Sequence, residues 1–295
     1  MLVNCKLCGS AHIIPAISNL RIRQGETGNL TEDSYSVIEC EECGIQYLDP
    51  FPEVGKDYYS SGLYRTEWSP DQIIDKSYFT EFDVNHVEHL RRITANNLRG
   101  NIVADYGCGA GSFLDVISGL TKKTIGIEPD GRYYQSLRSR NHKVLRSVDD
   151  VESSSIELAT NFDVIEHIED PRTFLSSIYR ALVSDGLFYC LTPNREQILL
   201  RCGPQGYRQF WYRTVHYWYF NDTSFRRLAE SVGFKDVKVR FVQRYDISNF
   251  VLWLRDNKPT GLGKIEIFDD SFETAWKSNL ERQGYADFLW LEATK

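Results

Sequence analysis

The feature that most constrains the fold is a short strand, a glycine loop and a helix in direct succession. Residues 101–105 have an apolar centre, Gly107, Gly109 and Gly111 follow in alternation, and an apolar helical run begins after Ser112. This order is typical of nucleotide-binding βα units, because glycine lets the backbone approach a ligand closely. The segment therefore predicts a parallel sheet with helices packed on it.

A second unit of the same kind follows and suggests the ligand. Residues 123–127 form the next apolar strand and end in Glu128, about 20 positions after the loop, where an acidic residue can bind both hydroxyls of a ribose. A dinucleotide fingerprint would need glycine at the position of Ser112, so that alternative fails. An ordinary tight turn, in which the three glycines have no ligand-binding role, remains an alternative. Two such units predict a doubly wound, Rossmann-like, mostly parallel sheet.

Four of the seven cysteines form two Cys-x-x-Cys pairs, Cys5 with Cys8 and Cys40 with Cys43, each followed by glycine. Two intervening residues let both thiolates of a pair reach one metal ion, and two pairs complete a tetrahedral four-thiolate site. The pattern predicts a closed, structural zinc site. The alternatives are two disulfides, which a reducing compartment disfavours, and a dithiol redox site, which normally has one pair beside a βαβ unit.

The chain is predicted to have three parts. Polar and apolar residues alternate at 21–24 and 35–40, which predicts the strands of a small β-ribbon. We expect the zinc ribbon to occupy residues 1–50, a linker or lid residues 51–76, and a large α/β domain residues 77–295. Within that domain the pattern indicates insertions at about 195–220 and 242–283.

The charge and hydropathy of the chain exclude some classes of function. Lys and Arg number 34 against 41 Asp and Glu, a net charge of -7, which disfavours a nucleic-acid partner held by its phosphates. Charges interrupt every apolar stretch before the ~18 residues of a membrane helix. The first residues lack the basic and apolar regions of a secretory signal, so we expect a cytoplasmic protein.

Further motifs resemble a known family. Residues 105–111 have the sequence Asp-Tyr-Gly-Cys-Gly-Ala-Gly, 161–171 contain Asp-Val-Ile-Glu-His-Ile-Glu-Asp-Pro, and 186–194 fit a fifth strand with its exit loop. Over roughly residues 77–295 the chain is similar to class I S-adenosylmethionine-dependent methyltransferases. With its cysteine module it resembles the zinc-ribbon members that act on sugars in antibiotic and surface-polysaccharide pathways. The resemblance implies a seven-stranded sheet.

This resemblance also implies a cofactor and its binding residues. S-adenosylmethionine would be the cofactor and S-adenosylhomocysteine the product. Asp105 would meet the ammonium group or organise the loop, Glu128 would bind the ribose, and Asn161 would lie near the methionine moiety. The full predicted cofactor set is Asp105, Tyr106, Gly107, Cys108, Gly109, Gly111, Glu128, Pro129, Val148 and Asn161.

Methyl transfer to a hydroxyl needs a group that accepts the hydroxyl proton. His167 lies just after the predicted fourth strand, at the sheet edge where ligands of α/β folds bind, and histidine titrates in a suitable range. His167 could instead only pack against the cofactor or hold Glu166. His216 is the rival base, although its aromatic neighbours in the sequence also fit a structural role.

The acceptor is the least constrained part of the prediction. Residues 206–213 interleave aromatic residues with Arg208 and Arg213, which on an acidic protein suits a nucleotide-linked sugar with an arginine on its diphosphate. Aromatic packing of an insertion is an equal alternative. We expect O-methylation of a small polar acceptor. A sugar C-methyltransferase, an RNA or protein methyltransferase and a non-catalytic interaction protein remain alternatives, and the sequence indicates neither the oligomeric state nor a role for Cys202.

Overall fold

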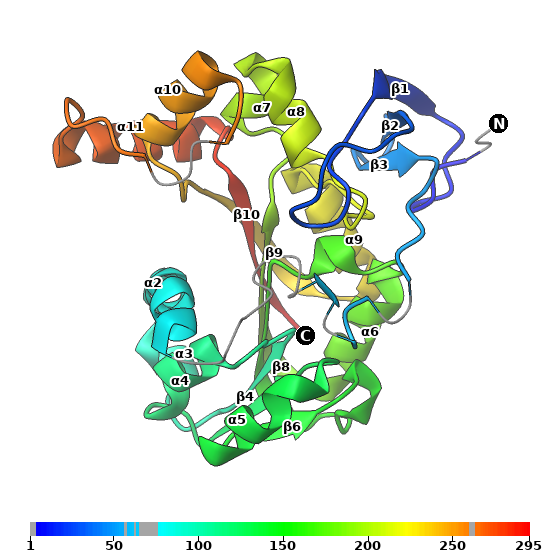
Figure 1. Cartoon of the computed structure of the whole chain (residues 1–295). Coiled ribbons are helices and arrows are strands. Elements are labelled where there is room, and N and C mark those ends of the chain that lie inside the picture. The colour runs from blue at the N-terminus through cyan, green and yellow to red at the C-terminus, as the bar shows by residue number, and fades with distance from the viewer. Residues whose placement is uncertain (1–3, 56–57, 62, 65–75, 260–262) are drawn as a thin grey trace.

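A computed structural model describes the chain except residues 1–3, 56–57, 62, 65–75 and 260–262. Its centre is a seven-stranded sheet in the order β6-β5-β4-β7-β8-β10-β9 (Figure 1). Neighbouring strands pair in parallel from β6 to β8, and β10 runs antiparallel to both β8 and β9. The predicted doubly wound, mostly parallel sheet is therefore confirmed. The strands are β4 (Ile102–Tyr106), β5 (Lys123–Ile127), β6 (Lys143–Leu145), β7 (Ile156–Phe162), β8 (Leu182–Pro193), β9 (Lys235–Val242) and β10 (Phe288–Thr294).

Two apolar cores, one on each face of the sheet, hold the helices in place. Successive side chains of a strand point to opposite faces. Accordingly, Phe288 and Trp290 of β10 join one core, whereas Leu289 and Leu291 join the other. The first core takes side chains from α2 (Lys76–Ile93), α4 (Ser112–Ser118) and α5 (Tyr134–Ser139), and the second from α6 (Pro171–Ala181) and α9 (Asp222–Val232). The short α3 (Ala95–Leu98) follows α2.

The strand register brings the predicted binding residues to one edge of the sheet. Tyr106, the last residue of β4, pairs with Ile127, the last residue of β5, so the glycine loop and Glu128 leave the sheet side by side. Asp105 of β4 pairs with Thr160 of β7 in the same way. The carboxyl ends of these parallel strands therefore form the edge at which ligands of open α/β sheets bind.

The N-terminal region forms a separate antiparallel sheet of β1 (Ile13–Leu20), β2 (Tyr35–Cys40) and β3 (Gln46–Asp49). The strand predicted at 35–40 is confirmed, whereas the one predicted at 21–24 is wrong. Arg23 there makes only isolated bridges, and its backbone N–H bonds to the carbonyl oxygens of Gln209 and Tyr212. The segment thus pairs with the large domain instead of with β2. Of the predicted linker at 51–76, residues 56–57, 62 and 65–75 lie outside the described part of the chain.

The small sheet packs against the large domain through polar and apolar contacts. The Arg195 side chain, just after β8, donates from Nε to the carbonyl of Gly44 at 2.9 Å and pairs with Glu39 at 2.9 Å. Ile45 and Tyr47 belong to the same apolar core as strand residues of the large sheet. The two sheets are therefore joined by a shared core.

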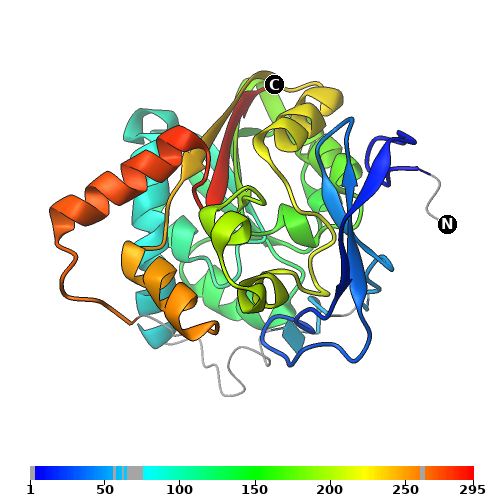
Figure 2. The ribbon, with the colours of Figure 1, turned by 90° about the horizontal axis from the view of Figure 1, so that it is seen from above.

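The regions predicted as insertions carry four helices. They are α7 (Ile198–Cys202), α8 (Gln205–Trp211), α10 (Ile247–Asp256) and α11 (Asp270–Gln283). The small sheet lies beside α8 and α9, while α11 lies at the opposite side of the molecule (Figures 1 and 2). Among the described helices, none combines the length and apolar character needed to cross a membrane.

Candidate active site

The glycine loop between β4 and α4 can be built only from glycine at its turning points. Gly107, Gly109 and Gly111 have φ values of 84°, 52° and 88°, a left-handed region that other residues rarely adopt. A Cβ at Gly107 would lie 2.4 Å from Cγ2 of Val164, and one at Gly111 would lie 2.4 Å from Cδ2 of Leu137. The loop is therefore packed tightly against the segment after β7 and against α5.

Two buried carboxyl groups flank this loop. Glu128 accepts hydrogen bonds from the backbone N–H of Gly109 at 2.8 Å and of Asp130 at 2.9 Å. Asp105 accepts from the hydroxyl of Thr160 at 2.7 Å, and burial raises the pKa of Asp105 to about 7. A cation beside Asp105 would favour its charged form. Both acidic residues therefore lie beside the glycine loop, and their contacts with the cofactor stay predictions.

Asn161 has a structural task that its sequence position does not reveal. Its fully buried amide donates from Nδ2 to the carbonyl of Tyr106 at 2.7 Å and accepts from the thiol of Cys190 at 3.3 Å. These contacts tie together the ends of β4, β7 and β8. The predicted contact of Asn161 with the methionine moiety stays a prediction.

The remaining predicted cofactor residues surround the same edge. Pro129 is exposed directly after Glu128, and the half-buried Val148 begins the 3-10 turn η2 (Val148–Asp150) that follows β6. Burial raises the pKa of the Cys108 thiol well above its usual range, and a Cβ at Gly126 would lie 2.6 Å from its Sγ. Cys108 therefore packs the loop onto β5 as a neutral thiol.

Helix α2 contributes residues that sequence analysis missed. The hydroxyl of Tyr78 accepts a hydrogen bond from the N–H of Ala110 at 3.3 Å, and Asp83 accepts one from the hydroxyl of Ser112. Helix α2 therefore lies over the glycine loop. No local motif marks these two residues.

Glu26, His167 and His216 form a second group, which we call the histidine cluster. One ligand atom from each lies within 4.8 Å of the others. Glu26 comes from the N-terminal region, His167 from the 3-10 turn η3 (Ile165–His167), and His216 from the segment before α9. The two imidazole rings meet edge to face with centroids 4.5 Å apart. The sequence indicated both histidines, but nothing in it connected Glu26 with them.

The hydrogen bonds of His167 fix its tautomer. Nδ1 lies 3.0 Å from the carbonyl oxygen of Val215 and 2.7 Å from the hydroxyl oxygen of Tyr59. Because a carbonyl oxygen can only accept, Nδ1 carries the hydrogen. Burial lowers the pKa of His167, which favours the neutral ring with its lone pair on Nε2. That atom lies 3.8 Å from Oε1 of Glu26.

Charged groups surround the cluster. Arg213 donates to Oε2 of Glu26 at 2.6 Å, and although burial opposes ionisation, the charge of Arg213 lowers the pKa of Glu26. Glu166 lies 4.0 Å from Nε2 of His167 and accepts from the hydroxyl of Thr192 at 3.0 Å. Burial raises the pKa of Glu166 to about 8. At neutral pH one carboxyl group beside the imidazole is thus ionised and the other is mainly protonated.

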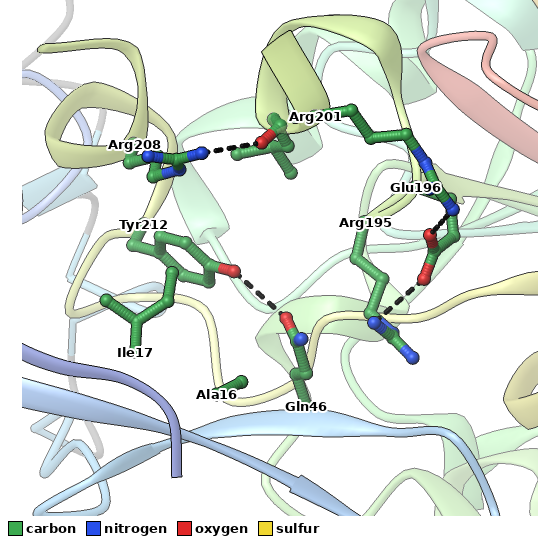
Figure 3. A pocket seen from close by; sticks show the side chains of 9 residues that line it. Ala16, Ile17, Gln46, Arg195, Glu196, Arg201, Arg208 and Tyr212 are labelled. Atoms are coloured by element: carbon green, nitrogen blue, oxygen red, sulfur yellow. Dashed lines mark hydrogen bonds and ion pairs between the residues drawn. The ribbon is translucent and has the colours of Figure 1, made fainter. Parts of the chain in front are cut away.

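A cavity of about 510 Å³ opens between the small sheet and helices α7 and α8 (Figure 3). Arg208 donates there to the carbonyl of Leu200 at 3.2 Å, while Arg195 and Arg201 both pair with Glu196. The cavity walls therefore carry more positive than negative side chains. They consist of Ala16, Ile17, Gln46, Arg195, Glu196, Leu200, Arg201, Arg208 and Tyr212.

The four paired cysteines converge as predicted from their spacing. Their Sγ atoms lie within 4.8 Å of one another, with 3.9 Å between Cys5 and Cys43 and 3.6 Å between Cys8 and Cys40. Zinc with four sulfur ligands at about 2.3 Å separates them by roughly 3.8 Å, so the cluster fits this ion. None of the seven cysteines forms a disulfide, and Cys202 is exposed at the end of α7.

The sheet order, the glycine loop and the acidic residue after β5 define a Rossmann-like methyltransferase fold. A family model described as a methyltransferase domain matches residues 84–239, just over half of the chain, and the chain belongs to this family. The crystal structure of a SAM-dependent methyltransferase from Archaeoglobus fulgidus superposes with a TM-score of 0.51 at 16% identity, covering 75% of this chain and 100% of that one.

Curated relatives carry the same description. A probable S-adenosylmethionine-dependent methyltransferase of Mycolicibacterium smegmatis is 33% identical over 106 residues, 34% of this chain and 41% of the relative. One from Mycobacterium tuberculosis is 30% identical over 131 residues, 43% of this chain and 46% of the relative. The chain thus spans less than half the length of the curated relatives it matches.

Proposed function

We propose that the protein transfers the methyl group of S-adenosylmethionine to a hydroxyl of a small polar acceptor, a sugar or a nucleotide-linked sugar. The supporting observation is that a neutral imidazole and the glycine loop meet at one sheet edge. Val164, which contacts the position of Gly107, stands only three residues before His167. The loop and the turn that carries His167 are therefore neighbours at this edge.

The cofactor would be held mainly by backbone and buried carboxylates. The glycine loop would approach the methionine end closely, Glu128 would bind the ribose, and Asp105 would pair with the ammonium group. Pro129 and Val148 would border the adenine. Bound S-adenosylmethionine supplies an electrophilic methyl group on a sulfonium.

In the proposed reaction the acceptor oxygen forms a bond to the methyl carbon while the carbon–sulfur bond breaks, leaving S-adenosylhomocysteine. The hydroxyl proton goes to Nε2 of His167, whose other nitrogen is fixed by Val215 and Tyr59. His216 packs edge to face on that ring and restricts its orientation. Positioning of this kind supplies much of the acceleration of a two-substrate reaction.

The acceptor class rests on the cavity in Figure 3. Its side chains Arg195, Arg201 and Arg208 suit a phosphate-bearing ligand, since guanidinium groups bind phosphate through paired hydrogen bonds. Arg213, the other arginine considered for this role, is engaged with Glu26. We propose Arg208 as the contact to a diphosphate.

The four-cysteine cluster is proposed to hold a structural zinc ion. Four thiolates leave no open coordination position, so this ion would stabilise the small sheet and take no part in the chemistry. Such a site also suits a reducing, cytoplasmic setting.

Two measurements test the proposed function. Calorimetric titration should show binding of S-adenosylhomocysteine, and mass spectrometry should detect a methyl group added to a member of a sugar-nucleotide panel. Failure of the folded protein to bind either S-adenosylmethionine or its product would contradict the proposal. Binding without transfer to any hydroxyl would instead favour a non-catalytic role.

A further inference from the structure

The histidine cluster has the composition of a metal site that is independent of the four cysteines. We propose that Glu26, His167 and His216 bind a divalent metal ion, with Oε1 of Glu26, Nε2 of His167 and a ring nitrogen of His216 as ligands. Two imidazoles and one carboxylate are a ligand set that zinc and related ions use.

The spacing of the three groups supports this inference. A tetrahedral ion with bonds of about 2.1 Å separates its ligand atoms by roughly 3.4 Å. Nε2 of His167 and Oε1 of Glu26 are 3.8 Å apart, and all three ligand atoms lie within 4.8 Å. Small side-chain adjustments would close the site around an ion.

The ring nitrogen of His167 that would not bind the metal has the kind of partner that metal-binding histidines normally have. A ligating imidazole usually donates its second N–H to a carbonyl or a carboxylate, which fixes the tautomer. Nδ1 of His167 does so with the carbonyl of Val215 at 3.0 Å. The lone pair on Nε2 then faces a carboxylate oxygen of Glu26, an arrangement that a cation between them would turn from repulsive to attractive.

His216 adds a second, independent observation. Its side chain is 6% exposed and is directed into the cluster, yet no hydrogen bond of its ring nitrogens is found within the described part of the chain. A coordinated ion would give one of these ring nitrogens a partner.

Of the neighbouring charged groups, the Glu26 carboxylate favours a cation and two arginines oppose it. Arg213 and Arg23 oppose it, since Arg213 pairs with Glu26 and Arg23 donates to the Glu26 carbonyl at 2.7 Å. Glu166 adds a carboxyl oxygen 4.0 Å from Nε2 of His167. The nitrogen ligands favour zinc, cobalt or nickel over magnesium.

An ion at this site would link the N-terminal region to the sheet edge. Glu26 belongs to the segment between β1 and β2, whereas both histidines belong to the large domain. Three protein ligands leave a coordination position open, where the pKa of a bound hydroxyl falls. This catalytic consequence rests on the proposed function. In the metal-free protein Nε2 of His167 would accept the hydroxyl proton, whereas in the metal-bound protein Nε2 is a ligand, the ion would lower the pKa of the hydroxyl, and the proton would pass to solvent.

Cobalt titration of the full-length protein, with zinc already in the four-cysteine cluster, tests the site. We expect one equivalent of Co²⁺ to bind with d–d absorption and without the thiolate charge-transfer band that cysteine ligands produce. Glu26→Gln and His216→Leu should each raise the dissociation constant at least ~10-fold. His86→Leu, which alters a histidine of α2 outside the cluster, should leave it unchanged.

S-adenosylhomocysteine titration of the same samples separates a lost site from a lost fold. Retained product binding with lost cobalt binding in both cluster variants supports the proposal. Absence of any cobalt beyond the cysteine cluster, or cobalt binding that survives in both variants, overturns it. Methyl transfer is measured separately, so a protein that binds cobalt but methylates no hydroxyl would refute only the proposed function.

Discussion

The glycine loop and the histidine cluster lie at the same sheet edge but are built in opposite ways. The loop is made of consecutive residues, and its shape depends on backbone conformation, with three glycines at positive φ. The cluster is made of side chains from Glu26, His167 and His216. Arg213 holds the carboxylate of Glu26, and the carbonyl of Val215 holds the ring of His167. A change in the loop should therefore affect cofactor binding, and a change in the cluster should affect turnover.

The two regions also differ in their dependence on the N-terminal region. The loop is held by β4, α5 and the segment after β7, all within the large domain. The cluster needs Glu26, which is fixed by Arg213 at 2.6 Å and by the neighbouring bond from Gly25 N–H to the hydroxyl of Thr214 at 2.9 Å. A mutation that perturbs the small sheet should thus displace the residues of the histidine cluster before those of the glycine loop.

Replacement of the proposed base tests the separation of the two regions most strongly. His167→Ala should lower kcat by ~10²-fold or more, because the hydroxyl that receives the methyl group loses the base that takes its proton. The dissociation constant of S-adenosylhomocysteine, measured by calorimetry, should stay nearly constant. His12→Ala, which alters an exposed histidine, serves as the control. Unchanged turnover in His167→Ala would assign proton transfer to another group.

Loss of the four-cysteine site should have the next largest effect. Cys40→Ser should release the zinc ion and displace Glu26, and a displacement of about 1 Å can lower turnover up to ~10²-fold. Product binding should persist because the glycine loop has its own supports. The metal content and steady-state kinetics of Cys40→Ser are compared with those of Cys202→Ser, which alters an exposed cysteine. Equal losses of turnover and product binding would show that the two regions are not separable.

The same contrast explains what could be predicted from the sequence. The glycine loop and the cysteine pairs are local patterns, in which spacing along the chain determines spacing in the fold. Glu26 and His167 stand 141 residues apart in the sequence, and only the docking of the small sheet unites them. The strand predicted at 21–24 failed for a related reason, because Arg23 pairs with the large domain and alternation cannot reveal a distant partner.

A single added methyl group in the loop should weaken cofactor binding. Gly107→Ala places a Cβ in a left-handed conformation, which costs roughly 1–2 kcal/mol, and 2.4 Å from Val164. We expect at least a ~10-fold higher dissociation constant for S-adenosylhomocysteine. Gly119→Ala is the matched control, because a Cβ there meets nothing within 4 Å. A Gly107→Ala protein that binds normally would show that the loop rearranges easily.

The smallest expected effect is a shift in pH dependence. Burial lowers the pKa of His167 and the negative charge of Glu26 raises it, so Glu26→Gln should lower this pKa further. A general base acts in its neutral form, which persists to lower pH when its pKa falls. The acidic limb of kcat/KM should therefore move to lower pH in buffer free of divalent ions. Its plateau should also fall, because the imidazole becomes a weaker base. A limb that moves to higher pH would contradict the role of His167, because removing the negative charge of Glu26 should lower the pKa of this imidazole.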